Sequence, residues 1–367
     1  MTTPVCDFVR EYQNRKCIRM HMPGHKGRVR IGPEPLDITE ISGADVLYAS
    51  GGILRESEEN AAGLFGSART VYSTEGSSLC IRAMLYLAMQ DAGRKGRRAR
   101  IAAGRNAHRV FSEAAALLDL DVCWVGECPD LLSCDIRPEM LEACFSDPET
   151  SPTALYVTSP DYLGQCADLE GLAGLCRRHG AMFLVDNAHG AYLKFLPTSK
   201  HPLDLGADLC CDSAHKTLNV LTGGAYLHAS SRCSPSVIPM MERAMALFAS
   251  TSPSYPVLQS LDAMNAELSD GSYARKLHER ETQMGTLKRI LSDSGWTLRG
   301  EEPMKLTLCP KSKGYSGLQL AELLAERGII CEFCDPDFTV LMPSAETGAG
   351  DLDLVRETLM GLESRPE

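Results

Sequence analysis

Short apolar runs alternate with a helical pattern between residues 153 and 216, and this alternation restricts the fold more than any other feature of the sequence. The runs at 153–160, 181–191 and 207–216 predict three strands; the first ends in small polar residues, the second ends at Asp186, and the third ends near Ser213. The segment at 168–180 has helical spacing, basic residues near its end and a terminal glycine, so it predicts a helix. Strand, helix and strand in this order predict a parallel sheet with crossover helices, and therefore an α/β fold.

The remainder of the chain predicts a second, smaller unit. The 367 residues are enough for one large domain and one small domain. We expect an N-terminal segment and large domain over 1–256, in which helices flank a mostly parallel sheet. A connecting helical stretch over 257–295 would lead into a small α+β domain over 296–367, where strand-like runs, among them 329–333, alternate with an amphipathic helical pattern.

Charge and apolar content exclude several classes of partner. The formal net charge of −11 argues against nucleic acid or an anionic membrane surface as the main partner. No segment is apolar for long enough to cross a bilayer, and the N-terminus lacks the apolar core of a signal peptide. We therefore expect a cytoplasmic protein that acts on a small molecule, with its 15 cysteines as free thiols.

Two motifs that resemble metal sites have simpler interpretations. Cys331 and Cys334 form a CxxC motif without a second pair at zinc-finger spacing, so two thiols beside a strand are favoured over a metal site. His21 and His25 are four residues apart, but the intervening proline and glycine exclude the helix that a zincin-type pair requires. We expect no metal.

Polar residues of the types that catalyse reactions or bind ligands follow the predicted strands. Ser159, Asp186 and Lys216 fall at or just after strand ends, where ligands of open parallel sheets bind. A lysine there is costly to desolvate unless it is neutralised, paired or used in covalent chemistry. Together with His189, Asp186 and Lys216 form the set that pyridoxal 5′-phosphate (PLP) requires: a Schiff-base amine, an acid for the ring nitrogen and a ring that stacks on it.

A phosphate-binding segment is also present. Gly76, Ser77 and Ser78 immediately precede a strongly helical run, where helix N–H groups attract phosphate. Taken alone, these residues are equally consistent with an ordinary serine cap. Ser213 and His215 lie close enough to Lys216 in sequence to reach the same phosphate. His108 lies in a strand-to-helix turn, which by itself favours a partly buried, hydrogen-bonded histidine.

The order of these motifs resembles the bacterial ornithine/lysine/arginine decarboxylase family, PLP enzymes of the aspartate-aminotransferase fold (fold type I). "RMHMPGHKG" at 19–27 is similar to the N-terminal H-x-P-G-H-K-G signature of the family. Further similar segments follow in family order at 53–78, 105–109, 185–192, 212–218, 251–255 and 314–333. The resemblance covers nearly the whole chain.

The resemblance implies a role for each candidate residue. Lys216 would be the Schiff-base lysine, Asp186 would hold the pyridine nitrogen, and His108 would stack on the ring. Ala188 and His189 would lie close to the ring. The residues implied at the phosphate are Gly76, Ser77, Ser78, Ser213 and His215. The family's active sites lie between two subunits of a homodimer, so Thr251 or Ser252 would reach the phosphate of the partner subunit.

The implied reaction is decarboxylation of ornithine, lysine or arginine. Glu332, Asp335 and Asp337 are candidates for the distal cation of the substrate, with Glu332 preferred, although each is also consistent with a solvated surface acid. Transamination or another Cα reaction stays open, although Arg327 is the only arginine between 305 and 344 that could clamp a carboxylate in the manner of an aminotransferase. A catalytically silent PLP-binding protein is the alternative outside enzymes.

The chain departs from the family pattern in three respects. Longer family members carry an N-terminal wing and a further C-terminal domain, which leaves the higher-order assembly open. Asn187 follows Asp186 where relatives often have glutamate. Glu75 precedes the phosphate-binding segment, where we expect a neutral residue.

Overall fold

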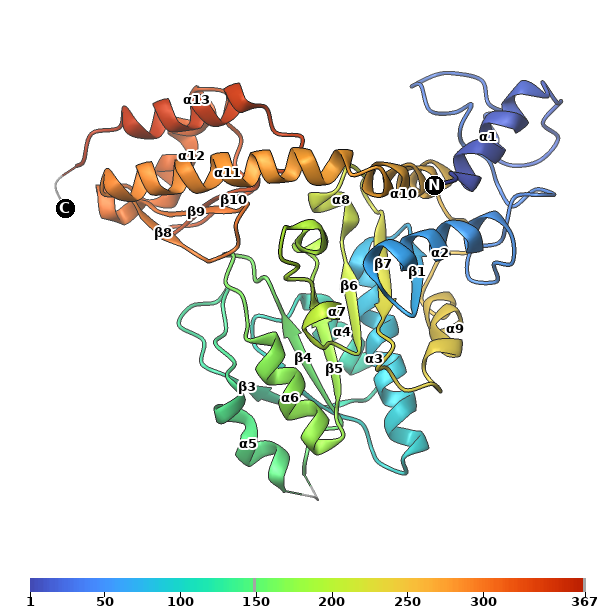
Figure 1. Cartoon of the computed structure of the whole chain (residues 1–367), viewed down its shortest axis with the longest axis horizontal. Coiled ribbons are helices and arrows are strands. Elements are labelled where there is room, and N and C mark those ends of the chain that lie inside the picture. Colours follow the sequence, from blue (N-terminus) through green and yellow to red (C-terminus); the bar gives the residue numbers. More distant parts are fainter. Residues whose placement is uncertain (148–149, 366–367) are drawn as a thin grey trace. The chain divides into compact units, whose positions relative to one another are not determined.

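A computed structural model describes residues 1–147 and 150–365 (Figure 1). The chain divides into two compact units. Unit 1 comprises Met1–Thr158, Ala167–Lys194 and Ser199–Ser272, and unit 2 comprises Ser159–Cys166, Phe195–Thr198 and Tyr273–Glu367. The boundaries predicted from sequence at 256 and 295 stay a prediction, and the last two residues of the predicted small domain lie outside the described residues.

Unit 1 contains a seven-stranded sheet with the strand order β1-β7-β6-β5-β4-β2-β3. Neighbours from β6 to β3 pair in parallel, and β7 pairs antiparallel with both β1 and β6. The sheet is therefore mostly parallel, as the sequence predicts. The strands are β1 (Arg69–Ser73), β2 (Arg100–Gly104), β3 (Asp121–Val125), β4 (Ala154–Thr158), β5 (Met182–Asp186), β6 (Leu209–Asp212) and β7 (Ala225–Ala229).

Helices flank this sheet on both sides (Figure 1). The longest, α3 (Gly76–Arg94), packs on β1, β5, β6 and β7, and its buried apolar side chains form the main core with alternate residues of the strands. On the other side, α6 (Leu169–His179) packs on β5. The other helical segments that begin in unit 1 are α1 (Pro4–Asn14), α2 (Ile53–Phe65), α4 (Arg109–Leu117), α5 (Pro138–Ser146), η1 (Ala191–Phe195), α7 (Pro202–Leu205), α8 (Ala214–Thr217), η2 (Ile238–Met240), α9 (Met241–Ala246) and α10 (Tyr255–Ser269).

The predicted strand–helix–strand order is confirmed, with shorter strands than the apolar runs. Helix α6 begins after Asp168, whose carboxylate accepts the N–H of Gly171, and it ends at Gly180 with a φ of 66°. Strand β5 ends at Asp186, as the sequence predicts, and the residues that follow turn and enter η1. Strand β6 ends at Asp212, and the short helix α8 carries Lys216 directly after it.

Unit 2 contains a four-stranded antiparallel sheet with the order β10-β11-β9-β8. Helix α12 (Gly317–Glu326) begins with a capping box formed by Ser316 and Gln319. The predicted strand at 329–333 is represented only by the two-residue β10, which starts at its last residue. The remaining elements are α11 (Ser272–Asp293), β8 (Thr297–Arg299), β9 (Leu306–Cys309), η3 (Pro310–Lys313), β10 (Phe333–Cys334), β11 (Thr339–Leu341) and α13 (Ala349–Met360).

The helical stretch predicted at 257–295 is two helices. Helix α10 ends at Ser269, and α11 starts at Ser272 after Gly271, whose φ of 73° favours glycine. Among the described residues, no helix combines the length and the apolar character that crossing a bilayer requires.

Candidate active site

The Lys216 amine and the His189 ring meet beyond the carboxyl ends of β5 and β6. Lys216 lies in α8 and His189 in the turn after β5, and their Nζ and Nε2 atoms are 2.8 Å apart. Lys216 is half-buried, and His189 is 6% exposed. When the Lys216 side chain is an ammonium, the Nε2 of a neutral His189 is the acceptor, and the imidazole proton is on Nδ1. The two groups can therefore share a proton.

The Asp186 carboxylate is held by donors from two other strands and from its own turn. Its Oδ2 accepts the hydroxyl of Tyr156 on β4 at 2.9 Å, and its Oδ1 accepts the N–H of Ala188 at 3.2 Å. The thiol of Cys211 on β6 lies 3.6 Å from the same Oδ1. Burial, together with the charge of Asp186, raises the pKa of Tyr156 well above its usual value, so the phenol keeps its proton and donates it.

His108 lies at the start of α4, and the charges of Asp186 and Lys216 both act on its ring. Its Nδ1 accepts the N–H of Val110 at 3.3 Å, so the ring caps the helix. Partial burial lowers the pKa of His108; the negative charge of Asp186 opposes this shift, while the positive charges of Lys216 and Arg109 add to it. A neutral imidazole beside Lys216 is the result near neutral pH.

The first turn of α3 contains the predicted phosphate-binding residues, which lie inside the helix rather than before it. The buried hydroxyl of Ser213 donates to that of Ser77 at 2.8 Å, which joins the start of α3 to the end of β6. The N–H of Gly76 donates to the carbonyl of Gly223 at 2.7 Å. Ser78 is half-buried one residue further along. N–H groups of a first turn have no acceptor within their own helix, so α3 provides a favourable site for an anion.

Two loops complete the surroundings of this helix terminus. The Nδ1 of His215 pairs with the carbonyl of Gly224 at 2.9 Å, which fixes the ring beside the loop that leads to β7. Glu75, the unexpected acid, accepts the N–H of Ser250 at 2.8 Å. This bond brings the segment with Thr251 and Ser252, both exposed, to the start of α3 in the same chain. Whether those residues serve a partner subunit stays a prediction.

A buried network around Asp212 was missed by the sequence reasoning. The Oδ2 of Asp212 lies 2.9 Å from the Nε2 of His201 and 3.3 Å from that of His228, and its Oδ1 accepts the Asn187 amide at 2.7 Å. Burial opposes ionisation of Asp212, but the two histidines hold its pKa well below the usual range. Asn187, which differs from the family pattern, therefore links the turn after Asp186 to this network.

Asp212 also belongs to one potential metal-binding group. Within residues 1–147 and 150–365, His201, Cys210 and Asp212 are the set whose ligand atoms lie within 4.8 Å of one another. The hydrogen bond between His201 and Asp212 already satisfies both groups. The arrangement is that of a hydrogen-bonded pair rather than of separated metal ligands.

The acids proposed for a distal cation lie in unit 2, where each has a partner. Glu332 accepts the hydroxyl of Tyr162 at 3.2 Å. Asp335 accepts the N–H groups of Asp337 and Phe338 and so closes a turn, while Asp337 forms an ion pair with Lys311. Glu332 and Asp337 are both exposed, but Asp337 is held in an ion pair, whereas the partner of Glu332 is a neutral hydroxyl. Glu332 stays the preferred candidate.

The N-terminal loop is the segment at 15–52 between α1 and α2, and its two histidines have different hydrogen-bond partners. The Nε2 of His21 lies 2.6 Å from the hydroxyl of Tyr12, whereas the Nε2 of His25 lies 3.1 Å from the carboxylate of Asp37.

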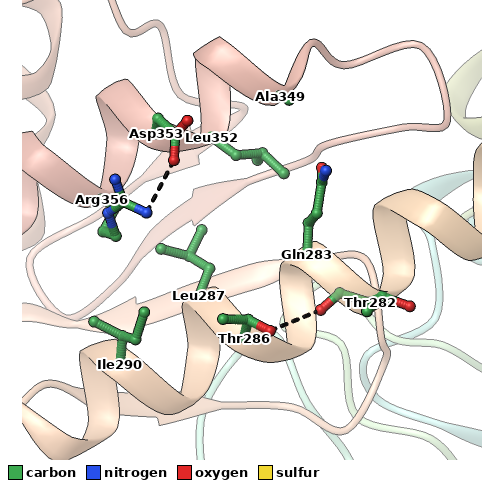
Figure 2. A pocket seen from close by; sticks show the side chains of 9 residues that line it. All are labelled: Thr282, Gln283, Thr286, Leu287, Ile290, Ala349, Leu352, Asp353 and Arg356. Atoms are coloured by element: carbon green, nitrogen blue, oxygen red, sulfur yellow. Dashed lines mark hydrogen bonds and ion pairs between the residues drawn. The ribbon is translucent and has the colours of Figure 1, made fainter.

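A pocket in unit 2 is unrelated to this chemistry. It lies between α11 and α13 and has a volume of about 190 Å³ (Figure 2). Its polar groups are paired: Arg356 with Asp353 at 2.9 Å, and the Thr286 hydroxyl with the Thr282 carbonyl at 3.1 Å. Apolar side chains such as Leu352 form much of the remaining wall. No set of convergent titratable groups like that around Lys216 lines it.

Residues 3–309 match the protein family described as "Orn/Lys/Arg decarboxylase, major domain". The chain belongs to this family. The family resemblance found in the sequence is thereby confirmed. The match covers the segments that carry Lys216, Asp186, His108 and the start of α3.

Several known proteins are similar to this chain in sequence or in fold. "Uncharacterized protein YaaO" of Bacillus subtilis (strain 168) is 30% identical over 366 residues, which cover 93% of this chain and 74% of that protein. An arginine decarboxylase of the same organism is 27% identical over 359 residues, which cover 88% of this chain and 69% of that protein. The lysine decarboxylase LdcF of Francisella novicida has a TM-score of 0.78 at 17% identity, with coverage of 97% of this chain and 59% of that one. The predicted fold type I architecture is confirmed, and this chain spans 59% of the length of that solved decarboxylase.

Proposed function

We propose that the protein is a PLP-dependent decarboxylase of a basic amino acid, ornithine, lysine or arginine. The observation that supports this most is the contact of 2.8 Å between Lys216 and His189, next to the buried carboxylate of Asp186. PLP supplies an electron-accepting ring that stabilises negative charge at the substrate Cα. The residues around Lys216 have the amine, the acid and the anion-binding helix terminus that such a group needs.

Each residue has a proposed task. Asp186, held by Tyr156 and by the Ala188 N–H, would keep the ring nitrogen protonated. The ring of His108 would stack on the PLP ring, with Ala188 and His189 close to it. The phosphate would be held by Gly76, Ser77, Ser78, Ser213 and His215.

Proton movement would follow from the Lys216–His189 pair. Because the two nitrogens share a hydrogen bond, a proton given up by Lys216 can return through His189 to the carbon that loses carbon dioxide. The pocket would have to orient the bond between the substrate Cα and its carboxylate so that PLP could accept the electrons left at Cα when carbon dioxide leaves. Glu332 is proposed to meet the distal cation, and Thr251 or Ser252 to reach the phosphate of a partner subunit in a homodimer.

The test is a product assay with PLP and each of ornithine, lysine and arginine. We expect release of carbon dioxide and one amine from one substrate, which would identify the specificity. Lys216→Ala should abolish both the product and the visible absorbance of lysine-bound PLP, while Lys200→Ala, an exposed lysine of the same unit, should change neither. Keto-acid production would instead indicate transamination, and bound PLP without any product would indicate a silent family member.

A further inference from the structure

Two cysteines in the segment between β3 and α5 have closely apposed sulfur atoms. The Sγ atoms of Cys128 and Cys134 are 3.1 Å apart. The next pair, Cys123 and Cys144, is wider at 3.7 Å and joins a strand to a helix. A disulfide bond is about 2.05 Å long, so the first pair needs about 1 Å of further approach.

The backbone around Cys128 and Cys134 already has the geometry that a disulfide requires. Glu127 and Asp135 exchange both of their backbone hydrogen bonds, at 2.9 and 2.7 Å, as a hydrogen-bonded pair of an antiparallel ribbon. Cys128 and Cys134 are the next pair inward, which is a non-hydrogen-bonded position where side chains approach most closely. The Asp130 carboxylate accepts N–H groups within the turn, at 2.9 and 2.8 Å, and fixes its shape.

The two thiols differ in access to solvent. Cys128 is exposed, whereas Cys134 is partly buried against two glycines. A Cβ on Gly126 would lie 2.9 Å from the Cys134 sulfur, and one on Gly104 would lie 3.3 Å from it. Burial, together with the neighbouring Cys128, raises the pKa of Cys134 to about 12. An oxidant in solution therefore reaches Cys128 first.

We propose that Cys128 and Cys134 form a site of reversible disulfide formation, with a small-molecule disulfide as the oxidant. The Cys128 thiolate attacks one sulfur of that disulfide, forms a mixed disulfide and releases one small thiolate. Cys134 then loses its proton and attacks the Cys128 sulfur, which releases the second small thiolate. Two protein thiols are oxidised, one small disulfide is reduced to two thiols, and both protons leave with them. Attachment of the small molecule to Cys128 removes one of the influences that raise the Cys134 pKa.

The site is connected to the loop that presents His108. The Cys134 sulfur lies close to the end of β2, since a Cβ on Gly104 would lie 3.3 Å from it. The backbone of Arg105 and Asn106, which follow β2 directly, opposes the rise in the Cys134 pKa. Movement of this sulfur towards Cys128 therefore changes its contacts with the segment that leads to His108. We expect the oxidised protein to bind PLP several-fold more weakly, a consequence that rests on the proposed function, whereas the disulfide itself does not.

The test uses the full-length folded protein treated with oxidised glutathione and cleaved before aspartate without reduction. Cleavage before Asp130 separates the peptide DVCWVGECP from DLLSC, so a bond between Cys128 and Cys134 leaves these two peptides joined. We expect most of the wild-type protein to yield the joined pair and to release both peptides after dithiothreitol. Cys123→Ser should keep the joined pair, and Cys128→Ser should lose it.

Two results would overturn the proposal. One is full alkylation of both thiols after the oxidant, measured on protein whose circular dichroism is native. The other is equal formation of the joined peptides in urea, which would mean that the fold does not direct the pairing. Titration with PLP of the oxidised wild type and of identically treated Cys128→Ser tests whether the disulfide affects the loop with His108. Equal PLP affinities would show that the disulfide does not influence the PLP site.

Discussion

Asp186 shows how single residues determine the chemistry of this site. The side chain is 2% exposed, and its carboxylate oxygens accept hydrogen bonds from the Tyr156 hydroxyl and the Ala188 N–H. A carboxylate in such surroundings loses stabilisation whenever a donor is removed, because no solvent replaces the missing bond.

We predict that Tyr156→Phe weakens PLP binding while the fold is retained. Loss of one hydrogen bond to a buried charged group corresponds to about 1.5–3 kcal/mol, or roughly tenfold or more in affinity. An absorbance titration with PLP measures the effect. Tyr226→Phe is the matched control, because the Tyr226 hydroxyl is buried without a hydrogen-bond partner among the described residues. Equal affinities of the two variants would mean that Tyr156 does not orient Asp186.

Site residues that follow a single apolar run are predictable from the sequence, whereas those whose contacts depend on the pairing of strands are not. Lys216 and His189 each follow a recognisable apolar run, so their meeting at one end of a parallel sheet is predictable. Tyr156 lies inside an apolar run, and its contact with Asp186 depends on the pairing of β4 with β5. Asp212 likewise gains its histidine partners from β7 and from the start of α7. Such contacts require the register between strands, which the pattern of a single strand does not contain.

At the scale of elements, the start of α3 depends on a close approach between two loops. Gly223 has a φ of 98°, and a Cβ there would lie 2.6 Å from the carbonyl oxygen of Thr74. Its own carbonyl accepts the N–H of Gly76. Only glycine fits this position without displacing the loop that precedes the helix.

We predict that Gly223→Ala weakens binding of inorganic phosphate or PLP by about tenfold and destabilises the fold by about 1–3 kcal/mol, since it combines a strained φ with a backbone clash. Gly63→Ala, in the exposed interior of α2 with open space around it, should instead be neutral or stabilise by about 1 kcal/mol. Denaturant unfolding and ligand titration of both variants provide the comparison. A Gly223→Ala protein with wild-type values would show that this approach has no role in the site.

The Asp212 network joins β5, β6, β7 and α7, so its loss should affect the whole sheet. We predict that Asp212→Asn lowers the free energy of unfolding by about 3 kcal/mol, because two buried histidines lose their anionic partner. The folded pKa of Asp212 lies below the unfolded value of about 4, so its contribution is present above that pH and is lost as the pH falls. The difference between the urea midpoints of the two proteins should therefore decrease as the pH falls below about 4. A constant difference would exclude ionised Asp212 as the cause.

The elements themselves are largely predictable, whereas their ends are not. The capped helix α6 and the capping box of α12 carry local signals, and both helices form where these signals indicate. The break between α10 and α11 follows from a single glycine inside a continuous helical pattern. Strand β10 shares only Phe333 with the longer apolar run at 329–333, because its pairing with β11 covers Phe333 and Cys334.

At the scale of the whole molecule, exposed apolar side chains gather in the N-terminal loop. Ile18, Met20 and Ile31 are 86%, 87% and 87% exposed. Several large apolar residues in one short segment are typical of a surface that another chain covers. This agrees with the proposed homodimer.

We predict a mass in solution of twice 39.9 kDa for the wild type and a shift towards the monomer in Met20→Asp with Ile31→Asp. Leu131→Asp is the control, because Leu131 is 95% exposed outside this segment. Light scattering after size-exclusion chromatography measures both. A wild-type monomer, or an unchanged dimer in the double variant, would remove the N-terminal loop from the interface.

The division of unit 2 among separate stretches of chain limits which gene segments can be exchanged by recombination. Its residues come from three separate stretches of chain, and the contacts between them are specific: Lys305 donates to the carbonyls of Asp161 and Tyr162, and Thr307 donates to that of Leu163. A gene segment that encodes only the stretch from Tyr273 onward lacks these acceptors. Recombination that exchanges this stretch between paralogues therefore separates buried donors from their acceptors unless the short stretch at 159–166 is exchanged with it. Sequence drift in the two stretches should accordingly be linked, although more than a hundred positions lie between them.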